Sequence, residues 1–73
     1  MSGEETIIEE TKNSISIFKK GYLPVLLTAI KREYSVVITM VEGFLEHDWE
    51  KTTIILSQEE CKKLAEKLLE FSR

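Results

Sequence analysis

The sequence contains few of the residues that mark a disulfide scaffold, a fibre or a nucleotide loop. Among 73 residues there are one cysteine, one proline and three glycines. The lone Cys61 excludes an intrachain disulfide and a cysteine metal cluster, and it fits a reducing compartment. Collagen-like and low-complexity chains are excluded by the same composition. The sequence also lacks a glycine-rich phosphate-binding loop.

Long apolar runs are missing as well. The longest run, Leu23 to Ile30, is interrupted by Pro24 and Thr28. A membrane-spanning helix needs about 20 apolar residues. The first residues carry neither the basic nor the apolar stretch of a signal peptide. The sequence therefore predicts a cytoplasmic or nucleoid-associated protein that is not secreted.

Positive charge is not in excess. The formal net charge is −3, and residues 1–11 hold four glutamates and no basic side chain. The remaining residues carry ten basic side chains against nine acidic ones. A strongly basic body, which would neutralise nucleic-acid phosphates, is therefore absent. This balance counts against any nucleic-acid function.

The length and composition indicate one small folded domain. Hydrophobic residues make up 42% and charged residues 32% of the chain, which is typical of a globular protein. A domain of this size buries only about 60% of the surface of its unfolded chain, so its stability is marginal without a partner. The size also argues against an enzyme with a deep pocket.

Alternating and β-branched segments predict strands at 14–19, 35–42 and 51–56. Residues 20–22 are predicted as a turn and 43–50 as a loop. Residues 1–13 are polar apart from Ile7 and Ile8, and we expect a flexible acidic arm there. Residues 14–73 then form a single α+β domain.

The end of the chain predicts a helix over residues 57–72. Ser57 and Glu60 have the spacing of a capping box. Cys61, Leu64 and Leu68 follow at helical spacing and predict an apolar stripe.

Residues 23–34 are ambiguous. As a helix they place Leu23, Leu26, Leu27, Ile30 and Tyr34 on one stripe, and Pro24 suits a first turn. As a strand, residues 25–30 supply the pairing partner that the neighbouring strands need. We expect the strand, which predicts a β-β-β-β-α chain with a four-stranded antiparallel sheet; the alternative is β-α-β-β-α.

Three segments resemble the positive cofactor four family of transcriptional coactivators and their small prokaryotic relatives that bind single-stranded DNA. T-T-I-I-L-S-Q-E-E-C-K-K-L-A-E-K-L at 52–68 is similar to that family's last strand and its capped helix. A-I-K-R-E-Y-S-V-V-I-T-M-V at 29–41 is similar to its basic turn between two strands, and D-W-E-K at 48–51 to the stretch before its last strand.

The resemblance implies a curved four-stranded sheet with one C-terminal helix, assembled as a homodimer. Geometry supports the dimer independently. Four strands make a sheet about 19 Å wide, whereas one helix covers only about 10–12 Å. A second copy would supply the missing layer, and we expect Cys61, Leu64 and Leu68 at the dimer interface.

Basic and aromatic residues at predicted strand ends and turns suggest a groove for single-stranded nucleic acid, because lysines follow phosphates while aromatic rings stack on bases. Trp49 is the strongest stacking candidate, since it lies in a polar segment; Tyr22 and Phe44 are weaker ones. The predicted phosphate-binding residues are Lys19, Lys20, Lys31, Arg32 and Lys51, and the predicted stacking residues are Phe18, Tyr34 and Trp49.

No pattern predicts catalysis, a metal or a cofactor. His47 between Glu46 and Asp48 lacks a second ligand cluster and is predicted as a solvated loop tip. Glu59 and Glu60 belong to a first helical turn, where carboxylates favour the helix dipole.

The sequence thus predicts a non-enzymatic, homodimeric protein that binds single-stranded nucleic acid, with DNA expected from the resemblance, and that acts in transcription, replication or repair. The alternative is a small dimeric interaction or regulatory module whose sheet edge or acidic arm docks another protein. Trp49 fluorescence would separate these two hypotheses.

Overall fold

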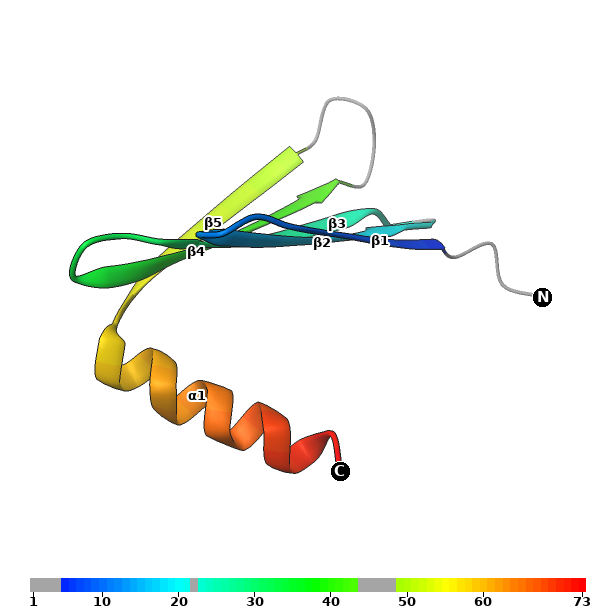
Figure 1. Cartoon of the computed structure of the whole chain (residues 1–73). Coiled ribbons are helices and arrows are strands. Elements are labelled where there is room, and N and C mark those ends of the chain that lie inside the picture. The colour runs from blue at the N-terminus through cyan, green and yellow to red at the C-terminus, as the bar shows by residue number, and fades with distance from the viewer. Residues whose placement is uncertain (1–4, 22, 44–48) are drawn as a thin grey trace.

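The computed structural model describes residues 5–21, 23–43 and 49–73. They form five strands followed by one helix (Figure 1). The elements are β1 (Glu5–Glu10), β2 (Ser14–Lys20), β3 (Val25–Lys31), β4 (Ser35–Gly43), β5 (Trp49–Ser57) and α1 (Gln58–Phe71).

The strands form one antiparallel sheet in the order β1-β2-β3-β4-β5, so each strand pairs with its neighbour in the chain. In the β1–β2 turn the backbone N–H of Thr11 donates to the carbonyl of Ser14 at 2.9 Å, and the two hydroxyls lie 2.7 Å apart. In the β3–β4 turn the N–H of Arg32 donates to the carbonyl of Ser35 at 2.8 Å. These short turns set the register, and the register decides which side chains share a face.

The prediction of a four-stranded sheet is wrong, because β1 adds a fifth strand at one edge. It pairs with β2 along its whole length, within the segment expected to be an acidic arm. Ile7 and Ile8 stand opposite Phe18 and Ile17, so each face of the strand has an apolar partner. The surrounding glutamates suit an edge, where charge discourages pairing with further chains. The mobility of residues 1–13 stays a prediction.

The ambiguous segment is a strand, and the alternative with a helix over residues 24–34 is wrong. β3 is a central strand that pairs with β2 on one side and β4 on the other. Val25 to Ala29 are all of intermediate exposure, so both faces of this strand are partly covered. A strand of this kind has consecutive apolar residues, and such a run also matches the spacing of an apolar helix stripe.

Helix α1 begins with the predicted capping box. The N–H of Glu60 donates to the Ser57 hydroxyl at 3.1 Å, and the N–H of Ser57 donates to the Glu60 carboxylate at 2.8 Å. Both bonds satisfy donors that the first turn leaves unpaired. At the other end the N–H of Ser72 donates to the carbonyl of Leu68 at 3.1 Å. The helix therefore starts directly at the end of β5, with no linker between them.

The two faces of the sheet are distinguished by α1. Opposed residues of an antiparallel pair share a face, and successive residues alternate. Val36 lines a cavity together with Cys61 and Ala65 of α1, so α1 lies on the face that carries Val36. We call this the helix face and the opposite one the open face. Figure 1 shows α1 on one side of the sheet, meeting it at the end of β5.

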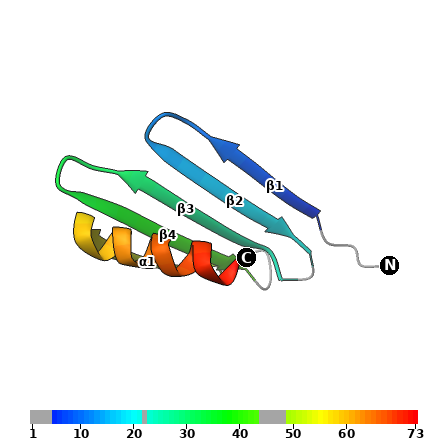
Figure 2. The ribbon, with the colours of Figure 1, turned by 60° about the horizontal axis from the view of Figure 1, so that its bottom comes forward.

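The helix leaves most of the helix face uncovered. Helix α1 contacts β4 and β5 but none of β1, β2 and β3, and Figure 2 shows these three strands extending beyond it. No hydrophobic side chain in the described part of the chain is buried. The apolar residues of the helix face are Ile8, Ile15, Ile17, Val25, Leu27, Ala29, Val36, Ile38, Met40, Ile54 and Leu56. This protomer therefore has an apolar layer with nothing packed over most of it.

Candidate nucleic-acid interface

The open face carries two aromatic and two basic side chains toward one end of the sheet. Phe18 on β2 and Lys51 on β5 lie in the same row across the strands, because the pairing runs from Phe18 through Leu26 and Val41 to Lys51. Between them the row is apolar. The row carries an aromatic ring near one edge of the sheet and an ammonium group near the other.

The next row toward the strand ends also holds one aromatic and one basic side chain, but here the basic one is on β2 and the aromatic one is on β5. Lys20 lies two residues beyond Phe18 on β2, and Trp49 lies two residues before Lys51 on β5, so both point to the open face. We call these four residues the open-face cluster. β2 and β5 are three strand spacings apart, about 14 Å. Each of these two strands thus contributes one aromatic and one basic side chain. The two aromatic residues lie diagonally across the face from each other, and so do the two lysines.

Gly43 positions the ring of Trp49. These residues are opposite each other across β4 and β5. A Cβ atom on Gly43 would overlap three carbons of the indole ring, so the ring lies directly on the glycine backbone. Trp49 remains 52% exposed. Its ring is therefore supported on one side and accessible to a ligand.

A row of hydroxyl groups crosses the open face beside the open-face cluster. Ser16 stands opposite Thr28, Thr28 opposite Thr39, and Thr39 opposite Thr53. We call these four residues the hydroxyl row, and Glu9 of β1 continues it opposite Ser16. None of the four hydroxyls makes a hydrogen bond to any of the residues that the structure describes. These hydroxyls interrupt the apolar surface with groups that can donate and accept hydrogen bonds.

The other four predicted nucleic-acid residues lie elsewhere. Lys19 and Lys31 belong to the helix face, because they stand opposite Val25 and Val36. Arg32 and Tyr34 are in the β3–β4 turn, at the end of the sheet away from Trp49, where Tyr34 is 79% exposed. The structure therefore groups Phe18, Lys20, Trp49 and Lys51 and separates them from the remaining predicted contacts.

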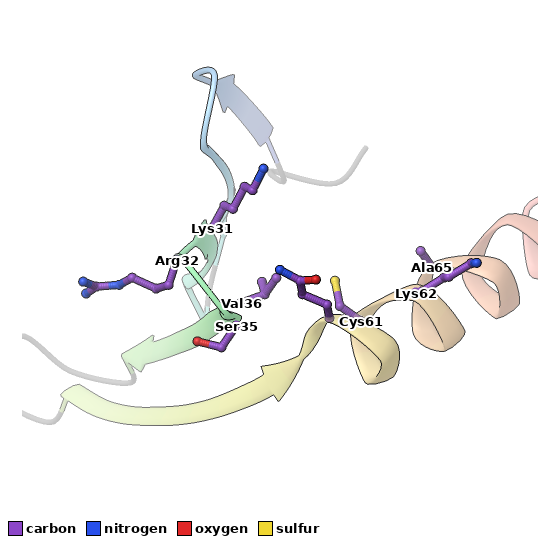
Figure 3. A pocket seen from close by; sticks show the side chains of 8 residues that line it. Lys31, Arg32, Ser35, Val36, Cys61, Lys62 and Ala65 are labelled. Carbon is purple, nitrogen blue, oxygen red and sulfur yellow. The ribbon is translucent and has the colours of Figure 1, made fainter.

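The basic β3–β4 turn borders a cavity of about 460 Å³ between the sheet and the start of α1. Figure 3 shows that Val36 and Cys61 point into this space, whereas Arg32 and Lys62 extend away from each other. Gln58 donates from Nε2 to the carbonyl of Glu33 at 3.4 Å and bridges the turn and the helix. Since the charged groups do not converge, the cavity is an apolar gap under the helix and not an anion site.

The predicted dimer residues lie on the same helix. Cys61 is half-buried against the cavity, and Leu64 and Leu68 are 43% and 54% exposed. Leu64 and Leu68 are one turn apart, so they extend the stripe that begins at Cys61 along the helix. The protomer itself covers little of this stripe.

Some predicted features fall outside the described residues. These are the possible stacking residues Tyr22 and Phe44 and the histidine tip formed by Glu46, His47 and Asp48. Within residues 5–21, 23–43 and 49–73 no three His, Cys, Asp or Glu side chains are grouped as metal ligands. In the same ranges no helix has the length and apolar character needed to cross a membrane.

Sequence reasoning missed both the hydroxyl row and the role of Gly43. Each residue of the hydroxyl row comes from a different strand, so only the register can reveal their alignment. The available signal was a serine or threonine at an inner position of each of β2, β3, β4 and β5.

Comparison of the chain with family models, with curated proteins and with solved structures finds no significant match. The resemblance to the coactivator family therefore stays a prediction.

Proposed function

We propose that this protein is a non-enzymatic binder of single-stranded nucleic acid and that the ligand lies on the open face. The observation that carries the proposal is the grouping of Phe18, Lys20, Trp49 and Lys51 at one end of that face. Bases stack on accessible aromatic rings with little dependence on sequence, and lysines nearby neutralise phosphates. The proposed setting is transcription, replication or repair, in line with the coactivator-like resemblance.

The electrostatic part of this binding is small. Among strand residues, the open face carries only Lys20 and Lys51 as cations, and β1 adds Glu5 and Glu9. Neutralising two phosphates gives a slope of log affinity against log salt of about −1.4 for a single strand. If all five predicted basic residues made contacts, the slope would be about −3.5. Salt dependence therefore distinguishes the open-face site from a site that also includes the β3–β4 turn.

We also propose that a second copy of the chain covers the helix face. The protomer exposes 6521 Å². A folded monomer of 8.5 kDa is expected to expose about 4,650 Å², so each protomer has about 1,900 Å² in excess. A second copy on the helix face would remove part of this excess, and the interfaces of obligate homodimers bury about 2,000 Å² or more.

The helix face suits this second copy better than the open face does. Its charged residues, such as Lys19 and Glu42, lie at strand ends, and the apolar side chains fill the middle. The open face has unpartnered hydroxyls in its middle, which a dry interface would leave unsatisfied. Leu64 and Leu68 would then meet the partner, and the open face of each copy would stay available to ligand.

The free sheet edges favour one alternative, a module that docks another protein. β5 ends the sheet, and all its residues except Leu56 are exposed. An extended peptide could add to such an edge through main-chain hydrogen bonds. This mode needs no aromatic ring and no nucleic acid, so the experiment below separates it from the proposal.

The test is a fluorescence titration of Trp49, the single tryptophan, with unlabelled oligonucleotides of about ten nucleotides. We expect stacking to quench the indole and the affinity to fall with a slope near −1.4 as salt rises. Lys20→Ala with Lys51→Ala should weaken binding. Absence of both quench and gel shift at micromolar protein in low salt would reject the proposal and leave the docking module.

A further inference from the structure

We infer that the hydroxyl row recognises the ribose 2′-hydroxyl, so that the ligand of the open face is single-stranded RNA in preference to DNA. This inference rests on the proposed function and names its substrate class. The feature that carries it is the alignment of Ser16, Thr28, Thr39 and Thr53 across four adjacent strands.

The hydroxyl row lacks partners within the protein. Ser16, Thr28 and Thr39 are of intermediate exposure, and none of their hydroxyls bonds to another described residue. Neighbouring threonines across strands often bond to each other, but these do not. Each hydroxyl thus keeps its donor and its acceptor free for a ligand.

The position of the hydroxyl row fits the sugar of a stacked nucleotide. On the open face, Ser16 lies two residues before Phe18 on β2 and Thr53 lies two residues after Lys51 on β5, a separation of about 6.8 Å in each case. A base stacked on Phe18 has its sugar beside the ring, so the sugar can reach the adjacent row. Along the row the hydroxyls recur about every 4.8 Å.

The charge of the row selects sugars over phosphates. Glu9 ends the row opposite Ser16, and no cation lies in the row itself. A carboxylate repels phosphate but accepts a hydrogen bond from a ribose hydroxyl, as acidic residues do in dinucleotide sites. Because the 2′-hydroxyl is what distinguishes RNA from DNA at a given site, a neutral and acceptor-rich row favours RNA.

The test compares oligonucleotides that differ only at the 2′ position. We expect oligouridine to bind about tenfold more tightly than oligodeoxyuridine in a Trp49 titration. Oligouridine with 2′-fluoro substituents keeps an RNA-like sugar but loses the hydroxyl donor, and it should bind like the deoxy form. Thr28→Val with Thr39→Val should bring the affinity for oligouridine down to that for oligodeoxyuridine and leave the latter unchanged.

Thr52→Val is the matched control, because Thr52 lies on β5 beside Thr53 but opposite Met40 on the helix face. It removes a hydroxyl from the same strand and should leave the RNA preference intact. Valine suits a strand, and circular dichroism should confirm the fold of each variant. Equal binding of all three oligonucleotides, or an equal loss for all three in the double variant, would overturn the inference while the proposed function stands. No binding of any of them would reject the proposed function itself.

Discussion

The two faces of the sheet differ in what interrupts their apolar surface. On the helix face the charged side chains are confined to strand ends, and α1 lies over only β4 and β5. On the open face a row of hydroxyls crosses the middle, and the open-face cluster lies beside it. A surface whose middle is mostly apolar gains by being buried, whereas one crossed by a row of unpaired polar groups gains by meeting a polar ligand. One small sheet can thus serve association on one side and recognition on the other.

The largest expected effect comes from charging the helix stripe. Leu68 is 54% exposed in the protomer, so Leu68→Glu would change the free energy of unfolding by no more than about 0.5 kcal/mol if the protein were a monomer. In the dimer the carboxylate is buried without a partner, which costs several kcal/mol, and we expect unfolding or aggregation. Leu64→Glu should behave in the same way.

Lys63→Glu is the matched control for these variants, because Lys63 lies on the opposite side of α1 and is exposed. It introduces the same glutamate one residue before Leu64 and five residues before Leu68, and it should leave the dimer intact. Analytical ultracentrifugation with circular dichroism provides the measurement. A folded, monomeric Leu68→Glu protein would show that the helix stripe is not the interface.

Removing the stacking ring should have the next largest effect. Stacking on an aromatic side chain contributes about 1–3 kcal/mol per base, so Trp49→Ala should weaken binding by about 5- to 150-fold. Tyr34→Ala is the control, since Tyr34 is more exposed but lies at the other end of the sheet. Fluorescence anisotropy of a labelled oligonucleotide measures both variants. Equal losses would mean that the ligand also reaches the β3–β4 turn.

Substituting the lysines of the open-face cluster should change the salt dependence of binding, whereas substituting the basic residues near the β3–β4 turn should not. Lys20→Ala with Lys51→Ala should remove most of the slope of about −1.4 expected for two phosphates. Lys31→Ala with Arg32→Ala should leave it nearly unchanged, because these residues lie away from the open-face cluster. Titrations at several salt concentrations measure the slope. The opposite pattern would move the site to the β3–β4 turn.

A smaller effect should follow Gly43→Ala. The new methyl group would overlap the indole, so the ring must move from its present place on the strand. We expect a few-fold loss of affinity and a changed Trp49 emission spectrum while the salt slope is retained, because Lys20 and Lys51 remain. An unchanged spectrum and affinity would mean that the position of the ring is not set by Gly43.

Local signals in the sequence predicted much of the fold. The capping box of Ser57 and Glu60 and the strands around residues 14–19, 35–42 and 51–56 depend on neighbouring residues in the chain. The strand in the ambiguous segment was instead predicted from the need of the other strands for a pairing partner, which β3 supplies to β2 and β4. β1 was missed because its glutamates resemble a solvated arm, and its pairing depends on Phe18 and Ile17 of another strand.

The candidate site was only half predictable. Lys19 and Lys20 are adjacent in the sequence but point to opposite faces, and a shift of one residue in the register would exchange them. Composition and spacing show that such residues are basic and lie near a strand end, but they do not show which face of the sheet each side chain is on. Only the pairing of β2 with β3 and β4 with β5 shows that Lys20 and Lys51 share a face while Lys31 does not.

The most direct test of the contrast between the faces uses the isoleucine methyl groups as reporters in NMR. Ile7, Ile30 and Ile55 are on the open face, whereas Ile17, Ile38 and Ile54 are on the helix face. In the isolated protomer Ile54 and Ile55 are 54% and 65% exposed, so a soluble paramagnetic agent would broaden both.

We predict instead that the agent broadens the open-face methyl signals and spares those of the helix face, including Ile54. An added oligonucleotide should then shift and protect the signals of Ile7, Ile30 and Ile55 only. Equal broadening of Ile54 and Ile55, or ligand-induced shifts confined to the helix face, would contradict the division of the sheet into one face for association and one for recognition.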